Sequence, residues 1–561
     1  MRGPQHLVSS RLTDANTKWF TLASACTVLF MVMLDNLVVN VAMPTISREF
    51  AASTSALQWI VSAYTLVFAS LQITAGGLGD RFGRKRWFLI GIMLFGLTSA
   101  AAAFSQSVEM LIAARAVQGL AAAFILPLSL SLVSAAFPPE ERGRAIGIWS
   151  AISVSGLAFG PIIGGVVVQY FTWNWVFLIN IPIVVVAYLI ASSAVQESRD
   201  TSGTVATDVP GTLLVTGAIG SLTWGLIEAG ERGWGSPFVL GTFAISAVLF
   251  AAFIWVESRT ARPMVPLSFF RSLTFSGANI DSFFISFMIA GLAFSLTLYM
   301  QNVHGMSPIR TGLTLLPMVI TQMIVTPIVG SLVNRVGPRR LISVGMLIVA
   351  GAALLFLRAS PTASFVDIIP AMVVMGFGSS LVFAPITTSV LNSVPTEKSG
   401  VASAVNGATR ETGFAFGIAL LGSVMNRTYQ DQFAADANVA QVRAVSEATG
   451  SPLGGLIDFV GEGMNAAGWV VEDPRLYADL PAGVLAQLQG SGVLTTIRQA
   501  SSEAFVAGMH WSFIISSIVL AAAAVLSWFL IEDKQVVGAR ETRRTPATAD
   551  PRPTLAAEPG D

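Results

Sequence analysis

Long apolar stretches recur along the chain, and they limit its possible folds more than any other feature. A helix needs about 20 mostly apolar residues to cross the hydrocarbon core of a bilayer. Only 11% of the residues are charged, against about 25% in soluble domains. The sequence therefore predicts an all-α polytopic membrane protein with fourteen transmembrane helices. The expected spans cover residues 18–42, 56–78, 87–105, 109–134, 144–168, 174–195, 209–228, 237–256, 274–300, 311–333, 340–358, 365–391, 400–424 and 507–531.

Basic residues are unevenly distributed among the expected loops. With an even number of spans both chain ends lie on one side, and the segments on that side hold most of the arginines and lysines. The short loops on the other side hold only Arg48, Arg232, Arg310 and Arg358. Because cytoplasmic loops are enriched in basic residues, we expect a multi-pass protein of the plasma (inner) membrane with both termini in the cytoplasm.

Two similar loop sequences indicate an internal repeat. GGLGDRFGRKR begins at Gly76 and GSLVNRVGPRR begins at Gly330. If spans seven and eight are treated as an insertion, the remaining spans form two groups of six. Each of the two loop sequences then follows the second span of its group. Transporters often place a substrate site between two such halves. The expected domains are a cytoplasmic N-terminus (1–17), a six-helix bundle (18–195), a linker with two extra helices (196–273), a second six-helix bundle (274–531) that includes a long extracytoplasmic loop (425–506), and a disordered cytoplasmic tail (532–561).

Four motifs resemble those of one transporter family. GGLGDRFGRKR resembles the loop between helices 2 and 3 of the major facilitator superfamily, and SGLAFGPIIGG (155–165) resembles its helix 5 antiporter motif. MLDNLVVNVAMP (33–44) and LIAARAVQGL (111–120) resemble the helix 1 and helix 4 motifs of its drug exporters. With fourteen spans, the chain resembles the EmrB/QacA-type drug:proton antiporters. This resemblance implies a major facilitator fold of two six-helix bundles plus two extra helices, and proton-coupled efflux of hydrophobic or amphipathic drugs and toxic compounds.

The first motif combines glycines with charges. The glycines let two helices approach closely, and Asp80 can cap the next helix or pair with the basic cluster, since a carboxylate is favoured near a helix N-terminus. Alternatively, the basic residues of this motif only anchor the loop on the cytoplasmic side of the membrane, as the enrichment of basic residues in cytoplasmic loops predicts. The resemblance implies a cytoplasmic gate between the halves, made asymmetric because Asn334 replaces the aspartate in the second copy. The expected gate residues are Gly76, Asp80, Arg81, Gly83, Arg84 and Lys85.

The helix 5 motif has small residues at regular spacing. Gly156, Gly160 and Gly164 recur every four residues beside Gly165, a pattern that lets helices touch in membranes. Pro161 is expected to kink this helix. Ordinary helix packing accounts for the same pattern, whereas the resemblance implies a tight seam between the halves that limits leakage.

Two charges lie deep in the expected spans. Arg115 lies about 9 Å below the outer end of span 4 and Asp35 about 10 Å below that of span 1, at 1.5 Å per residue. An ionisable group inside the bilayer is a candidate functional residue, and the shared depth allows an ion pair or a proton relay. We expect Asp35 to exchange protons beside Arg115. Two alternatives stay open: Arg115 can reach the outer headgroups, and Asn36 or Asn40 can hold Asp35 as a capped polar group.

Further candidates lie in both halves. Asp281 and Glu411 can recognise a cation or carry a second proton, while Arg410 matches an arginine of related exporters; pairing of Arg410 with Glu411 is the alternative. Aromatic and Met side chains suit a deformable cavity for apolar ligands, although each also fits ordinary packing. The expected cavity residues are Asn36, Asn40, Trp59, Tyr64, Asp281, Phe284, Met288, Tyr299, Arg410 and Glu411.

The sequence shows no phosphate-binding loop lysine, zinc-ligand spacing or nucleophile constellation. We therefore expect no enzymatic activity, no metal or other cofactor, and the proton gradient as the energy source. The expected partners are a small amphipathic substrate, protons and the lipid bilayer, with no nucleic acid, and the expected state is a monomer. Two rival hypotheses remain: an exporter of one metabolite (an antibiotic, a siderophore or an envelope lipid precursor), and a non-transporting membrane sensor or scaffold.

Overall fold

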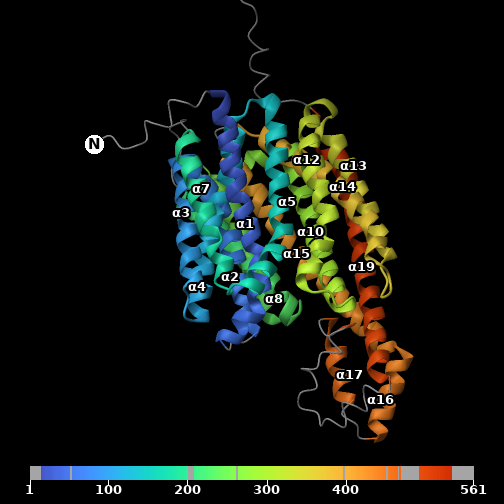
Figure 1. Cartoon of the computed structure of the whole chain (residues 1–561). Helices are drawn as coiled ribbons and strands as arrows, with labels where there is room; N and C mark the ends of the chain where they lie inside the picture. The colour runs from blue at the N-terminus through green and yellow to red at the C-terminus, as the bar shows by residue number, and fades with distance from the viewer. Residues whose placement is uncertain are drawn as a thin grey trace, which may run out of the picture.

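The computed structural model is a bundle of long helices (Figure 1). It describes residues 14–50, 54–199, 208–260, 263, 265–395, 398–449, 453–464, 467–468 and 492–533, and no strand occurs in these ranges. Within them, twelve helices are long and apolar enough to cross a membrane. Two further helices, α5 (Pro139–Tyr170) and α15 (Ser399–Ala435), have 32 and 37 residues and pack among the others. The chain is therefore a helical multi-span membrane protein, and the count of fourteen spans stays a prediction.

Local sequence signals set several helix starts. The Ser107 hydroxyl accepts a hydrogen bond from the backbone N–H of Met110 at 3.2 Å, which satisfies a free donor at the start of α4. Proline occupies the first turn of α5, α9 and α13, where the missing N–H has no helical partner.

The first half contains α1 (Asp14–Phe50), α2 (Thr54–Phe82), α3 (Arg84–Ala103), α4 (Val108–Ala136), α5, α6 (Trp175–Leu178) and α7 (Asn180–Ala194). The expected sixth span is thus divided at Ile179 into α6 and α7. In this half α1 packs on α5 and α7, and α4 packs on α2 and α3. Buried aliphatic and aromatic side chains from all these helices form its core.

The second half contains α10 (Leu273–Leu298), the π-helix η3 (Tyr299–Val303), α11 (Pro308–Thr314), α12 (Leu316–Val336), α13 (Pro338–Leu355), α14 (Phe365–Asn392), α15 and α19 (Val493–Leu530). Both α15 and α19 run beyond the expected spans into the segment 425–506. There α16 (Ala437–Thr449) and α17 (Leu453–Glu462) project from the bundle (Figure 1). They lie opposite the end of the bundle where α1 begins and α19 finishes, here called the terminal end.

The two extra helices are α8 (Val209–Arg232) and α9 (Pro237–Arg259). Helix α8 packs on α2 of the first half and on α15 of the second. The hydroxyls of Thr74 and Thr216 lie 3.0 Å apart between α2 and α8. In the α8–α9 turn, Trp234 Nε1 donates to Ser423 Oγ of α15 at 2.8 Å. This hairpin therefore bridges the two halves at their edge, a position that no motif in the sequence indicated.

The two related loops have the same backbone design. Gly83 and Gly337 have positive φ angles of 112° and 93°, a conformation that favours glycine. In the first half, the backbone N–H groups of Lys85 and Arg86 donate to the Glu197 carboxylate at 3.0 and 3.1 Å. In the second half, the backbone N–H of Arg339 donates to Asp533 Oδ1 at 3.2 Å. Each half thus uses a carboxylate placed after its last helix to bind the start of the helix that follows the loop, α3 in the first half and α13 in the second.

Candidate functional site

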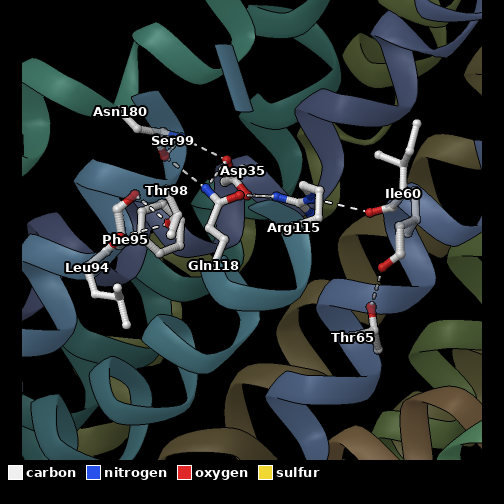
Figure 2. A network of polar contacts seen from close by, with 11 residues as sticks. Asp35, Ile60, Thr65, Leu94, Phe95, Thr98, Ser99, Arg115, Gln118 and Asn180 are labelled. Atoms are coloured by element: carbon white, nitrogen blue, oxygen red, sulfur yellow. Dashed lines mark hydrogen bonds and ion pairs between the residues drawn. The ribbon is translucent and has the colours of Figure 1, made fainter. Parts of the chain in front are cut away.

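Asp35 of α1 and Arg115 of α4 lie against each other inside the first half (Figure 2). Arg115 Nη1 donates to Asp35 Oδ2 at 2.5 Å, and both side chains are 0% exposed. This burial excludes the alternative in which Arg115 reaches the outer headgroups. Removing one partner from a buried ion pair leaves an uncompensated charge, so each residue depends strongly on the other.

Side-chain amides complete the surroundings of Asp35 (Figure 2). Gln118 Nε2 and Asn180 Nδ2 donate to Asp35 Oδ1 at 3.1 and 2.7 Å, and Gln118 Oε1 accepts from Arg115 Nη1 at 2.7 Å. The Ser99 hydroxyl accepts from both amides at 2.9 and 3.2 Å. Asp35 is therefore held by Gln118 and Asn180. Within the described part of the chain Asn36 forms no hydrogen bond with Asp35, and the side chain of Asn40 lies outside the described residues.

The sequence carried a signal for one of these amides. Gln118 follows Arg115 by three residues in LIAARAVQGL, so both side chains share one face of α4. Asn180 is an isolated amide in the run WNWVFLINIP and gave no indication that it reaches α1. Its role depends on how α7 packs against α1.

Tyr64 of α2 closes another side of this network. The Arg115 guanidinium carbon lies 4.3 Å from the centre of the Tyr64 ring, within cation–π range. The Tyr64 hydroxyl and Arg115 Nη2 are buried without a hydrogen-bond partner in the described part of the chain. Because buried polar groups are nearly always hydrogen-bonded, these two donors mark a place where water or another polar group can bind.

Asp80 joins the halves at the terminal end. Its Oδ1 accepts from Arg84 Nε at 2.7 Å and from the backbone N–H of Gly400 at 3.1 Å, and its Oδ2 accepts from the backbone N–H of Val401 at 2.9 Å. Gly400 and Val401 belong to the first turn of α15, where the helix dipole favours a carboxylate. The contact therefore links α2 of the first half to α15 of the second.

The other residues of this loop have contacts of their own. Gly76 packs directly on the Gly400 carbonyl, and Lys85 Nζ donates to the Ser192 carbonyl within the first half at 2.8 Å. Arg81 lies over the Phe82 ring. In the second copy Asn334 is exposed, whereas Asp80 is buried. The two matching positions therefore differ in their exposure to solvent.

Further contacts between the halves lie at the terminal end. The hydroxyls of Ser131 and Ser399 are 3.0 Å apart, and Arg142 Nη1 donates to Asn392 Oδ1 at 3.4 Å. Together with the Asp80 contact, these interactions connect the two halves at the terminal end.

The glycines of α5 contact neighbours in both halves of the protein. A side chain at Gly156 would collide with α1 of the same half, and one at Gly165 would collide with Ile309 of the other half. Gly143 packs against Gly330 of α12. Of the expected seam residues, Gly165 thus contacts the other half, whereas Gly156 packs within its own half. Gly143 also contacts the other half, although it lies outside the motif. Gly160 and Gly164 are buried, α5 is one helix across this motif, and the side chain of Pro161 lies outside the described residues.

Substituting Gly330 by alanine is expected to weaken the packing of the two halves at the terminal end and to destabilise the protein. An added methyl group at Gly330 would collide with the Gly143 carbonyl oxygen, and such overpacking costs about 1–3 kcal/mol. Thermal unfolding in detergent measures this effect as a lower unfolding temperature. The control is Gly351→Ala in α13, where nothing lies within 4 Å of the added atom. Equal behaviour of the two variants would contradict the role of this contact.

Several expected cavity residues lie inside the second half. Asp281 Oδ1 accepts from Ser527 Oγ of α19 at 2.7 Å. Met288 is fully buried in the core, and the Tyr299 hydroxyl donates to the Ser360 carbonyl at 2.7 Å. These three side chains are therefore engaged within one bundle.

The aromatic candidates have other neighbours. Trp59 of α2 packs edge-on against Trp224 of α8, with ring centres 6.1 Å apart. Phe284 packs edge-on against Phe283 of the same helix at 5.4 Å. Trp59 thus contacts the extra hairpin.

A small pocket lies between the halves. Arg410 is the one expected cavity residue that lines it, and Arg410 and Glu411 form no salt bridge with each other or with any other described residue. The pocket is lined by Leu126, Leu130, Trp149, Thr387, Ser403, Asn406, Gly407 and Arg410. Sequence reasoning did not single out Trp149 or Asn406, since neither belongs to a motif.

The fold, the Asp80 loop and the helix 1, 4 and 5 motifs agree with one family. Residues 25–418 match the model of the family described as the Major Facilitator Superfamily. The chain belongs to the major facilitator superfamily. It is therefore a membrane transporter and not an enzyme.

Relatives within the superfamily resemble the chain over most of its length. The tetracenomycin C resistance and export protein of Streptomyces glaucescens is 34% identical over 91% of this chain and 91% of its own. The multidrug efflux pump LfrA of Mycolicibacterium smegmatis is 32% identical over 91% of this chain and 95% of its own. The multidrug resistance protein Stp of Mycobacterium tuberculosis is 38% identical over 73% of this chain and 76% of its own.

Solved structures of the superfamily have the same fold. A double Trp mutant of XylE superimposes with a TM-score of 0.58, covering 92% of this chain and 96% of that one at 13% identity. The human organic anion transporter MFSD10 gives a TM-score of 0.54, covering 95% and 100% at 13% identity. At this identity the likeness concerns the fold alone.

Proposed function

We propose that this transporter exports hydrophobic or amphipathic organic compounds, including drugs, across the plasma membrane in exchange for protons. The observation that carries the proposal is the Asp35–Arg115 ion pair, which is fully buried in a membrane protein. An intramembrane ion pair is expensive and marks a proton or substrate pathway. The relatives named for drug resistance and export support efflux as the direction of transport.

Asp35 is the proton carrier in this scheme. As a carboxylate it holds Arg115, Gln118 and Asn180 in one arrangement. Protonation removes its charge and frees the Arg115 guanidinium, whose Nη2 already lacks a partner in the described structure. Each ligand shifts the balance between conformations only by its difference in affinity for them. The proton therefore favours one arrangement of α1 and α4, and the substrate favours the other.

The terminal end is the cytoplasmic end in this proposal, and both chain termini lie in the cytoplasm. The Asp80 contact with α15 then acts as the cytoplasmic gate, which opens when the halves rock apart around the substrate. We keep the domain boundaries predicted from the sequence. In this scheme the α8–α9 hairpin stays in contact with both halves at the edge where they meet. The protein works as a monomer and uses the proton gradient as its energy source, without a cofactor.

The test uses inverted membrane vesicles with an acidified lumen. We expect a transported compound to raise the luminal pH, followed with a fluorescent pH indicator, because it enters the lumen as protons leave. Vesicles without the protein are the control. No luminal change across a broad panel of drugs and dyes would overturn the proposal and favour a non-transporting sensor or scaffold. A deletion strain distinguishes the two kinds of exporter. Increased susceptibility to several unrelated compounds indicates multidrug export, and increased susceptibility to none indicates export of a single metabolite.

A further inference from the structure

Asp281 is a buried acid of the second half that the proposed transport step does not use. It lies on α10 and is 1% exposed. Its Oδ2 atom has no hydrogen-bond partner in the described part of the chain, and no salt bridge among the described residues includes it. An ionised carboxylate that is buried without a cation is very costly, so such a group becomes neutral instead. The surroundings of Asp281 therefore favour the protonated acid.

The hydrogen bonds of Ser527 lead to the same conclusion. Ser527 Oγ of α19 lies 2.7 Å from Asp281 Oδ1, 2.8 Å from the Ala523 carbonyl oxygen and 3.6 Å from Met346 Sδ of α13. A hydroxyl group has one hydrogen to donate, so with an ionised Asp281 the two oxygens compete for it. With a protonated Asp281, the acid donates to Ser527 Oγ and the Ser527 hydroxyl donates to the Ala523 carbonyl. Only the neutral acid thus gives each of the two short contacts its own hydrogen.

The charged pair of neighbours on α15 does not neutralise Asp281. Helix α10 contacts α15 through Asn279, whose Oδ1 accepts from Asn406 Nδ2 at 3.3 Å. Asp281 follows Asn279 by two residues, about 200° around the helix, and contacts α19 instead. One turn after Asn406, Arg410 lines the pocket between the halves. Neither Arg410 nor Glu411 forms a salt bridge with Asp281 in the described structure.

The other neighbours of α10 carry their charged or titratable residues away from this level. On η2 (Leu267–Arg271), η3, α13, α14 and α19 these residues are Arg271, Tyr299, Arg339, Arg340, Asp367, Arg498, Glu503 and His510. His510 lies 17 residues before Ser527 on α19, which is about 26 Å at the helical rise. Arg339 lies about 10 Å along α13 from Met346, and its Nε donates to the Ile531 carbonyl at 2.6 Å. Asp281 therefore has a hydroxyl beside it and no paired cation among the described residues.

We infer that Asp281 is a second proton-binding site, at which a permanently bound proton joins α10 to α19. The neutral acid donates to Ser527 and keeps a charge out of the core of the second half. This role differs from that of Asp35, which has Arg115 as a partner when it is ionised. Asp281 is thus a structural acid and not a second carrier of transported protons.

Infrared spectroscopy of the purified full chain in nanodiscs tests the protonation of Asp281. A protonated carboxylic acid has a carbonyl stretching band that a carboxylate lacks. At neutral pH, Asp281→Asn should lose such a band, and Ser527→Ala should shift it because the acid loses its hydrogen-bond acceptor. The control Asp458→Asn removes an exposed carboxylate paired with Arg443 and should leave the band unchanged. A band that neither Asp281→Asn nor Ser527→Ala alters, or the absence of any such band in the parent, would overturn the inference.

Thermal unfolding at different pH values gives an independent measurement. The folded chain keeps a proton on Asp281 that the unfolded chain releases above about pH 4, so this site stabilises the fold less as the pH rises. Asp281→Asn cannot ionise and keeps an amide donor for Ser527. Between about pH 5 and about pH 8, the unfolding temperature of the parent should therefore fall relative to that of Asp281→Asn. Parallel pH profiles of the two proteins would contradict a proton held at Asp281.

Transport in vesicles separates this inference from the proposed function. In inverted vesicles with an acidified lumen, Asp281→Asn should give the same luminal pH response as the parent, because the proton on Asp281 is never released. Loss of the response in a folded Asp281→Asn protein would show that Asp281 carries transported protons, so the inference fails while the proposed export stands. No response in the parent contradicts the export function, and the infrared band then still decides the protonation of Asp281.

Discussion

Replacing Asp35 by asparagine is expected to abolish proton-coupled efflux. Asparagine cannot release a proton, and it leaves Arg115 without its carboxylate in a fully buried site. Breaking a buried ion pair in this way costs about 3–5 kcal/mol. The substrate-induced rise in luminal pH should therefore disappear, and the thermal unfolding temperature in detergent should fall.

A double variant separates the loss of the proton carrier from the loss of stability. Asp35→Asn with Arg115→Gln removes both charges, so the unfolding temperature should recover while the luminal pH response stays absent. The control is Asp458→Asn, which removes the carboxylate of an exposed ion pair with Arg443 at 2.9 Å. Exposed pairs contribute about 0–1 kcal/mol, so this variant should behave as the parent does. Proton-driven efflux by Asp35→Asn would show that another group carries the proton.

Replacing Asp80 by asparagine is expected to open the terminal end and reduce transport about tenfold or more. The carboxylate accepts hydrogen bonds from Arg84 and from the backbone N–H groups of Gly400 and Val401. Hydrogen bonds to a charged group contribute about 1.5–3 kcal/mol each, and the start of α15 loses its favourable negative charge. The arrangement that is closed at this end should therefore become less populated.

Opening is measured by maleimide labelling of a cysteine placed at Ser399, which faces Ser131 across the halves. The native Cys26 is the single cysteine of the chain and is buried, so background labelling should be low. Labelling should be faster with Asp80→Asn than in the parent, and Asp80→Glu should be intermediate. Asn334→Ala changes the matching position of the second copy, which is exposed, and should have little effect. Unchanged labelling in Asp80→Asn would show that this carboxylate does not hold the halves together.

The sequence could predict that Asp35 and Arg115 lie at the same level, but it could not predict their immediate surroundings. The fixed rise per residue of a helix placed Asp35 and Arg115 at one level. It could not give the rotation of α1 and α4, which turns both side chains into the interior of one bundle. Asn180 reaches the same carboxylate from α7, a contact between residues 145 positions apart that no local pattern encodes.

The sequence was a poorer guide to the residues that line the pocket between the halves. Asp281, Met288 and Tyr299 had the right residue types and depth, yet their side chains are engaged within the second half. Arg410 lines the pocket between the halves. An apolar helix in a membrane has no strongly polar face to show which side meets protein and which meets lipid, so its sequence does not specify its rotation.

By itself the sequence determined that this protein is a helical membrane transporter with a repeated loop and charges inside its spans. It did so because a bilayer requires long apolar helices and makes an intramembrane charge too costly to keep without a use. Only the tertiary structure decided which charges meet, that Asp80 binds the start of α15, that the α8–α9 hairpin bridges the halves, and that Arg410 faces a pocket without an acid. Those outcomes depend on how helices distant in the chain pack and rotate against one another, and close packing between them is set by side chains from several helices at once.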